Sequence, residues 1–254
     1  MTNTTIELIH QHGSVRHYKS DPLPKEMIET IVAAGQRAAT SSNLQMFSVV
    51  ALTDLEQRKQ MQAYCGGQKH ISQAPVFLAW VADLSRLERI CQARGYKQQA
   101  GMVENFLLAA VDAAIAAQNA GLAAESMGLG FCYIGAIRNK PRNVIRLLKL
   151  PRLTFPVVGM TLGWPVKAPM IRPRLPLETI LHWDTYDTTG EAEQLEQYDR
   201  EMIETGIYRG RQVKADDPTP AEQYGWTEHS ARRAAQVMRP HLREVLLEMG
   251  FELK

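Results

Sequence analysis

Apolar residues recur along the chain with two periods, one typical of helices and one typical of buried strands. Helical spacing predicts helices at residues 5–12, from Pro24 to about 35–39, from Asp54 to 64, from Asn139 to about 150, and around 242–249. Runs of β-branched and apolar residues predict strands at 48–52, 75–82 and 156–162. Strands separated by helices in this order predict a mixed α/β sandwich in which helices cover a small sheet.

The longest apolar segment runs from Met102 to Leu129. It contains Glu104, Asp112 and Glu125, so it is a poor candidate for a membrane span. A helix that is rich in alanine and apolar on most of its circumference needs protein on most sides. We therefore expect a central helix that is buried in part by a second subunit.

Beyond Lys167 the character of the chain changes. Four prolines form a connector to an acidic helix at about 191–205, which is followed by a basic stretch at 208–214 and a loop at 215–225 that is rich in helix breakers. We therefore divide the chain into a core at residues 1–166 and a C-terminal arm and excursion at 167–254.

Composition and charge narrow the function classes. The 254 residues include 29 Lys and Arg against 27 Asp and Glu, and this near-balance argues against a nucleic-acid binder. The three cysteines show no metal-ligand spacing, so we expect reduced thiols and no metal site. The first residues have no basic or apolar region typical of an export signal, and we expect a soluble cytoplasmic protein without membrane attachment.

Several polar groups suit a planar, anionic ligand. The segment His12–Arg16 and the pair Arg172 and Arg174 offer guanidinium groups for phosphate, although each alone could equally be a solvated surface group. Gly66–Gln68 lets the backbone approach a ligand and adds an amide, but an ordinary turn at a helix end explains it as well. Because the familiar nucleophile, metal and phosphate-loop motifs are missing, a reaction carried by a cofactor is favoured.

Seven segments in one order resemble a known family over nearly the whole chain. They are Thr5–His12 with Ser14–Arg16, Gly66–His70, Ala123–Gly130, Tyr133–Asn139, Leu147–Pro151, Leu162–Pro165 and Arg172–Pro176. Together they resemble the oxygen-insensitive NADPH nitroreductases of the major (group A) type and the related NADPH–flavin oxidoreductases. The resemblance implies an α+β fold, a three-layer α/β/α sandwich with an antiparallel or mixed central sheet. It also implies a homodimer that binds FMN across its interface.

The resemblance assigns roles to particular residues. The positions implied to contact FMN are His12, Gly13, Ser14, Val15, Arg16, Thr40, Gln68, Tyr133, Ile134, Gly135, Ala136, Arg172 and Arg174. Arg209 is implied to recognise the 2′-phosphate of NADPH, and a solvated surface arginine is the alternative. Ser41, Ser42, Asn43 and Arg239 are implied to line the substrate pocket. Core residues 1–166 would hold FMN, and residues 167–254 would add phosphate, NADPH and dimer contacts.

Two positions depart from the family pattern. Gly13 stands where the family usually has arginine, so we expect one cation fewer near FMN and weaker retention of FMN. Asn43 replaces an apolar or aromatic residue, which bears on the substrate range. The implied reaction is a ping-pong transfer of two electrons from NADPH to nitroaromatics, quinones or other electron-poor small molecules, with Arg16 as the catalytic residue. The alternatives are a flavin reductase that supplies free FMNH2 and a flavin-binding sensor without turnover.

Overall fold

The structure is a computed structural model, and it describes residues 2–214, 219–220 and 222–254. The described chain forms two compact units. The first consists of residues up to Met170 together with Arg239–Lys254, and the second is Ile171–Met238. Within the breaker-rich loop predicted at 215–225, residues 215–218 and 221 lie outside the described residues.

A four-stranded sheet forms the centre of the first unit. Its strands are β1 (Phe47–Leu52), β2 (Val76–Asp83), β3 (Gly130–Ile134) and β4 (Thr154–Gly163). They lie in the order β1-β2-β4-β3, and each neighbouring pair is antiparallel. The strands predicted at 48–52, 75–82 and 156–162 are confirmed within two residues at each end. Of the two sheet types expected, the described strands form the antiparallel one.

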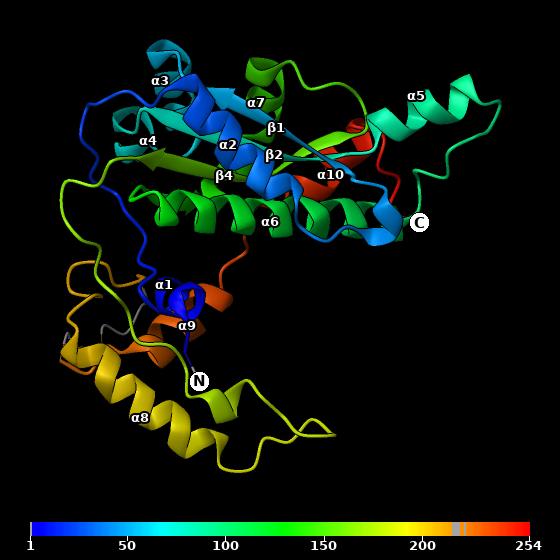
Figure 1. The fold of residues 1–254 in the computed structure, drawn as a ribbon. Coiled ribbons are helices and arrows are strands. Elements are labelled where there is room, and N and C mark those ends of the chain that lie inside the picture. Colours follow the sequence, from blue (N-terminus) through cyan, green and yellow to red (C-terminus); the bar gives the residue numbers. More distant parts are fainter. Residues whose placement is uncertain (1, 215–218, 221) are drawn as a thin grey trace. The chain divides into compact units, whose positions relative to one another are not determined.

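One face of the sheet is covered by α6 (Val103–Ser126), with α2 (Lys25–Gln36) packed beside it (Figure 1). Close packing is possible because α6 turns a row of alanines toward the sheet, where Trp80 and Phe131 are fully buried. By length and composition alone, α6 is also apolar enough to cross a membrane. In this fold it is the central helix that the sequence predicted. The short helix α1 (Thr4–His10) also contacts α6.

The opposite face of the sheet carries a second helical layer. It is formed by α3 (Leu55–Tyr64), α4 (His70–Gln73), the 3₁₀ turn η2 (Gly135–Arg138) and α7 (Pro141–Leu148). Met61, Phe77 and Ile137 are fully buried in this layer. The start of α3 follows from a local signal, because the Asp54 carboxylate accepts a hydrogen bond from the Gln57 N–H at 2.9 Å. Helices therefore cover both faces of the sheet, giving three layers.

The C-terminal residues return to the first unit. Helix α10 (Leu242–Glu248) buries Val245, and Phe251 is fully buried beyond it. The backbone N–H of Val103 donates to the Lys254 carbonyl at 3.0 Å, which ties the chain end to the start of α6. The division predicted at residue 166 places these last residues with the C-terminal arm. Residues 239–254 instead belong to the first unit, where the apolar side chains of α10 and Phe251 are buried.

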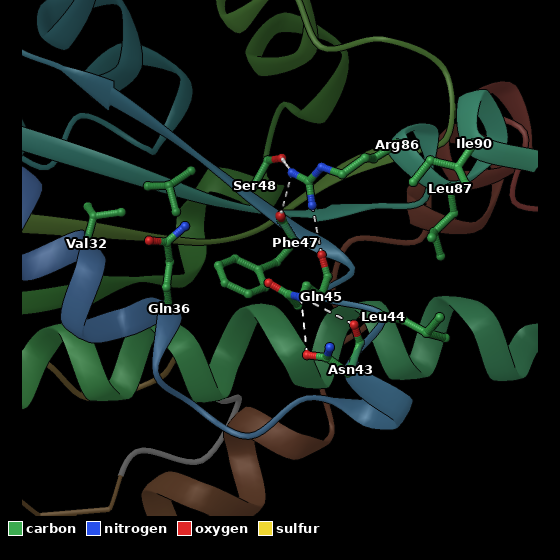
Figure 2. A pocket seen from close by; sticks show the side chains of 11 residues that line it. Val32, Gln36, Asn43, Leu44, Gln45, Phe47, Ser48, Arg86, Leu87 and Ile90 are labelled. Atoms are coloured by element: carbon green, nitrogen blue, oxygen red, sulfur yellow. Dashed lines mark hydrogen bonds between the residues drawn. The ribbon is translucent and has the colours of Figure 1, made fainter. Parts of the chain in front are cut away.

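Strand β1 is an edge of the sheet, and a side chain covers part of its free backbone. Arg86, from α5 (Ser85–Ala93), donates to the carbonyl oxygens of Gln45 at 2.9 Å and Phe47 at 3.2 Å. The same guanidinium donates to the Ser48 hydroxyl at 2.9 Å, and Figure 2 shows all three bonds. The first two bonds satisfy backbone carbonyls at the free edge of the sheet, where no further strand pairs with β1 among the described residues.

The second unit is helical. It contains η3 (Leu177–Thr179), α8 (Glu191–Glu204) and α9 (Trp226–Ala234). Helix α8, predicted at 191–205, buries Tyr198 and Met202. Its Asp199 carboxylate accepts a hydrogen bond from the Thr227 N–H at 2.7 Å, which fixes the first turn of α9 to α8.

Candidate functional site

The segment His12–Arg16 crosses the end of strand β3. The Val15 N–H donates to the Phe131 carbonyl at 2.9 Å, and the His12 ring lies 5.0 Å from the Phe131 ring. His12 Nδ1 is 2.6 Å from the Glu125 carboxylate. The pairing leaves Nε2 as the ring nitrogen that His12 has to offer a ligand. Ser14 is exposed, while the Val15 side chain is buried.

Gly13 has no room for a side chain. A Cβ atom placed on it would lie 2.7 Å from Cβ of Pro169 and 2.8 Å from the carbonyl oxygen of Met170. The segment that includes Pro169 is held along this loop, because the Val166 N–H donates to the His17 carbonyl at 3.1 Å. Gly13 is therefore a position of close backbone approach. The expected effect of Gly13, one cation fewer near FMN and weaker retention of FMN, stays a prediction.

Arg16 lies in a polar cluster at the same end of the sheet. The charge of Arg16 helps to lower the pKa of His70, for which burial is the main cause and His17 a further one. His70 Nε2 is buried and has no hydrogen-bond partner among the described atoms. Gln68 donates its amide N–H to the Cys65 carbonyl at 3.0 Å, so its amide oxygen is left to accept.

The end of β3 presents small and apolar groups beside this cluster. Tyr133 and Ile134 are the last strand residues, and Gly135 and Ala136 open η2. Tyr133 Oη donates to the Gln118 amide oxygen at 3.3 Å, and burial raises the pKa of this phenol.

Two further cations lie at η2. Arg138 donates to the Val157 carbonyl, and burial together with the nearby Arg239 lowers its pKa. Arg239 donates from Nε to the Asn139 amide oxygen at 2.8 Å, and a Cβ on Gly66 would lie 3.6 Å from Asn139 Nδ2. The predicted residue Arg239 thus lies near the glycine turn that precedes Gln68.

The hydroxyl-rich loop at 40–43 is held by a buried carboxylate. Asp112 of α6, 2% exposed, accepts hydrogen bonds from the Thr40 hydroxyl at 2.6 Å, the Ser41 N–H at 3.2 Å and the Met46 N–H at 3.0 Å. The loop includes η1 (Ser41–Asn43), and Ser42, Asn43 and Gln45 all have positive φ. The Thr40 hydroxyl is thus committed to the protein, whereas Ser42 is exposed.

Asn43 lines a pocket of about 650 Å³ between α2, the start of β1 and α5 (Figure 2). The Gln45 amide donates to the Asn43 carbonyl at 3.3 Å and to its side-chain oxygen at 3.2 Å. Phe47 and Arg86 also line the pocket. Asn43 therefore faces a mixed polar and apolar cavity.

Within one chain, the 40–43 loop and the 12–16 segment lie far apart. Helix α6 holds the first through Asp112 and the second through Glu125. Thirteen residues separate these two positions, which corresponds to about 20 Å at the helical rise of 1.5 Å per residue. The structure therefore brings together the predicted residues at 12–16, 68, 133–136 and 239, and it leaves Thr40–Asn43 apart from them.

The remaining predicted cations belong to the second unit. Arg174 donates to the carbonyl oxygens of Arg172 at 3.2 Å and Pro173 at 3.3 Å, and Tyr198 Oη donates to the latter carbonyl at 3.3 Å. Both arginines lower the pKa of Tyr198, although burial raises it overall. Arg209 is exposed and its side chain folds over Gly206. The convergence of 12–16 with 172–174 on one ligand stays a prediction.

Several residues of the site were not found from the sequence. In the sequence, Asp112 and Glu125 stand out only as charges that interrupt an apolar helix, and His70 and Arg138 lie within longer motifs that assign them no role. The usable signal was the placement of acids on an otherwise apolar helix, since a buried carboxylate requires donors nearby. Among the residues that the structure describes, no group of three or more His, Cys, Asp or Glu could hold a metal ion.

The donor set suits a planar anion with a polar edge. Arg16, Arg138 and Arg239 are partly buried cations, Gln68 has an amide oxygen to offer, and His70 Nε2 is a buried polar atom that lacks a partner. Two small residues, Gly135 and Ala136, follow the end of β3 next to them. A cofactor with an aromatic ring system and a phosphate therefore fits the residues present.

The antiparallel sheet, its two helical layers and this polar cluster define a cofactor-binding α+β protein. Comparison with known families is specific. Residues 9–164 match the model described as the nitroreductase family, and residues 172–254 match the one described as the C-terminal domain of the nitroreductase family. The chain therefore belongs to the nitroreductase family.

Named relatives cover almost the whole chain. The oxygen-insensitive NADPH nitroreductase of Salmonella typhimurium is 38% identical over 247 residues, covering 97% of this chain and 98% of the relative. The FMN reductase [NAD(P)H] of Bacillus subtilis is 34% identical, with 99% of each chain covered. The solved structure of nitroreductase A from Vibrio parahaemolyticus superposes with a TM-score of 0.89 at 37% identity and covers 100% of both chains. The α+β nitroreductase fold is thus confirmed.

Proposed function

We propose that this chain is an FMN-dependent NADPH oxidoreductase that reduces nitroaromatics, quinones or similar flat, electron-poor molecules by two-electron hydride transfer. The observation that carries the proposal is the polar cluster of Arg16, Gln68 and His70 beside the end of β3, in a chain of the nitroreductase family. The names of relatives that cover the chain include NADPH nitroreductase and FMN reductase. Bound FMN would supply a ring system that accepts and donates hydride.

The chain's own residues would bind and orient the reactants. We assign Arg16 to stabilise the negative charge gained on reduction, because a preorganised cation at developing charge is among the larger catalytic effects. Gln68 would accept a hydrogen bond from the polar edge of the ring through its amide oxygen. His70 stays neutral beside Arg16, since burial lowers its pKa, so it could accept or donate at Nε2 without adding repulsion.

The residues at the end of β3 would form the flat surface against the ring. We assign Arg172 and Arg174 to the FMN phosphate and Arg209 to the 2′-phosphate of NADPH, because guanidinium groups pair with phosphate through charge-assisted hydrogen bonds. Ser41, Ser42, Asn43 and Arg239 are the residues we assign to the substrate.

A homodimer is part of the proposal. Helix α6 exposes apolar residues at every fourth position, and an unpartnered apolar row of this kind is typical of an interface. The exposed fractions are 54% for Val103, 56% for Leu107, 43% for Val111 and 39% for Ile115. A second copy that covers this row would also supply a 40–43 loop to the 12–16 segment, which lies about 20 Å from its own loop. Light scattering should give twice the chain mass for the wild type and a lower mass for Val111→Lys.

The test of the activity is direct. The purified protein should show flavin absorption bands, and these bands should bleach when NADPH is added without oxygen. A nitroaromatic or quinone added next should restore them. A protein that copurifies without flavin, and that does not oxidise NADPH after FMN is supplied, would refute the proposal. Because the three cysteines are odd in number and widely spaced, which favours reduced thiols, we place the activity in the reducing cytoplasm.

A second candidate is a flavin reductase that releases reduced FMN. It is supported by the Bacillus subtilis relative, whose name is FMN reductase [NAD(P)H]. Free FMN would then be turned over by NADPH without any nitro or quinone acceptor, and the product would leave the protein. Steady oxidation of NADPH with any acceptor would exclude a sensor without turnover.

A further inference from the structure

The loop Tyr208–Lys214 presents three exposed cations in a fixed turn. Its cations are Arg209, Arg211 and Lys214. The turn is closed by backbone hydrogen bonds from Arg209 to Gly206 at 3.1 Å and from Arg211 to Tyr208 at 2.9 Å. Gly210 has a φ of +69°, a conformation that other residues rarely adopt. We call this segment the cationic loop.

Helix α9 holds the first end of the cationic loop. The Tyr208 ring stacks on the His229 ring with centroids 4.3 Å apart and 20° between the planes. Burial and the nearby Arg233 lower the pKa of His229, so this ring is neutral near pH 7. Since Tyr208 directly precedes Arg209, the stack on His229 also fixes the position of the Arg209 backbone.

The second end is held at both backbone groups of Val213, by Arg232 of α9 and by Tyr224, which lies just before α9. The Val213 N–H donates to Tyr224 Oη at 2.9 Å, and the Val213 carbonyl accepts from Arg232 at 3.0 Å. Tyr224 is buried, and its Oη lies 3.2 Å from His229 Nδ1. The Tyr224 hydroxyl therefore accepts from Val213 and can donate its proton to the neutral His229, which joins the two ends of the loop.

Arg232 belongs to the support. Its side chain is 12% exposed, and its Nε donates to the Glu228 carboxylate one turn earlier. It also donates to the Thr219 hydroxyl at 2.7 Å and lies 5.2 Å from the centre of the Tyr224 ring. Because its charge is paired with Glu228 and its donors are used within the unit, Arg232 acts on the loop backbone.

Helix α9 is itself fixed to α8. In addition to the bond from Thr227 to Asp199, the Trp226 ring packs edge-on against Tyr198 with centroids 5.5 Å apart. A Cβ on Gly225 would lie 2.3 Å from the Asp199 carboxylate, so the approach of the two helices requires glycine there. The support of the cationic loop is thus a packed helix pair.

We propose that α9 preorganises the cationic loop for the 2′-phosphate of NADPH, with Arg232 and His229 as positioning residues. The inference rests on the proposed NADPH activity. A phosphate of nearly two negative charges gains most from cations whose backbone is already fixed, because ordering a free loop costs conformational entropy at each residue. Preorganisation of this kind improves affinity mainly by lowering the cost of binding.

The test compares two arginines on the same helix. Arg232→Met keeps an apolar stem against Tyr224 and loses every donor, while Arg233→Met removes the same charge from an exposed residue whose contact is Gln236. We expect Arg232→Met to raise the KM for NADPH about tenfold, which corresponds to roughly 1.4 kcal/mol. The KM for NADH and the dissociation constant for FMN should not change. Arg233→Met should change the KM for NADPH by no more than about twofold relative to the wild type.

Hydrogen exchange adds a readout that does not depend on activity. Residues 208–213 should exchange faster in Arg232→Met than in Arg233→Met, in the protein without NADPH. Should Arg232→Met fail to fold, Tyr208→Leu removes the ring contacts of Tyr208 with His229 and Tyr224 and should raise the KM for NADPH in the same way.

The outcomes separate this inference from the proposed function. If Arg209→Ala leaves the KM for NADPH unchanged, the proposed contact with the 2′-phosphate is wrong, and the role of α9 falls with it. If Arg209→Ala raises the KM while Arg232→Met and Tyr208→Leu do not, only the role of α9 is overturned. If Arg232→Met and Arg233→Met raise the KM for NADPH equally, the effect comes from the lost positive charge alone, and the positioning role of α9 is also overturned.

Discussion

Removing the Asp112 carboxylate should both destabilise the protein and loosen the 40–46 loop. Asp112→Ala deletes three hydrogen bonds to a charged acceptor, and the Met46 N–H is left buried without a partner. Hydrogen bonds to charged groups contribute about 1.5–3 kcal/mol each, and such losses within one network do not add fully. We expect the free energy of unfolding to fall by about 3–5 kcal/mol.

The loop gives a reason for the large effect. Ser42, Asn43 and Gln45 adopt left-handed conformations that cost about 1 kcal/mol or more each in residues other than glycine. Asp112 holds the loop in this conformation, so the loop should relax when the carboxylate is gone. Asp112→Asn should cost less, about 1–2 kcal/mol, since one amide oxygen can still serve either Ser41 or Met46.

Urea unfolding measures the stability, and hydrogen exchange of residues 40–46 measures the loop. Glu104→Ala is the matched control, because it removes an exposed carboxylate from the same helix and should cost less than about 1 kcal/mol. The reasoning is refuted if Asp112→Ala costs no more than this control and exchange in the loop is unchanged.

Three further predictions follow from the 12–16 segment and its neighbours. Arg16→Ala, saturated with FMN, should be reduced by NADPH about 10²-fold more slowly in stopped flow, and an unchanged rate would remove its catalytic role. Gly13→Arg should lower the melting temperature without tightening FMN binding, because its Cβ would overlap Pro169 and the Met170 carbonyl. Adding Pro169→Gly should recover part of the stability, and tighter FMN binding by the single variant would contradict the reasoning. The pKa of His70 is lower in the folded protein than in the unfolded chain, so the unfolded chain binds a proton at this histidine more readily. The free energy of unfolding should therefore be highest above pH 6.5 and fall as the pH drops below that value. His70→Gln should weaken this fall in denaturant titrations at pH 7.5 and 5.5, and an identical pH dependence would count against it.

The parts of the fold that could be predicted are those with local causes. The start of α3 is encoded by Asp54 and Gln57, three residues apart, and the strands by runs of apolar residues that are buried on both faces. The start of α5 was missed because its cap is the Asp83 carboxylate, the last residue of a strand, which accepts from the Ser85 N–H at 2.9 Å. Helix α9 was missed because Asp199 of another helix fixes it.

The site divides in the same way. Motifs located the 12–16 segment and the end of β3, since each is a continuous stretch. Asp112 was not recognised as the anchor of Thr40, because the two residues are 72 positions apart and only the fold makes them neighbours. The packing of Gly13 against Pro169 is likewise non-local. The sequence therefore indicated that a cation is missing at this position, but not that a side chain has no room there.

The guanidinium of Arg86 also protects the protein against self-association through its backbone. An exposed strand with open carbonyl groups is a template on which a strand of another molecule can align, and such pairing leads to aggregates. Because Arg86 occupies the Gln45 and Phe47 carbonyls from the side, an incoming strand would have to displace a cation before it could pair there. A short apolar residue at this position would leave the molecule folded and make concentrated solutions prone to precipitate.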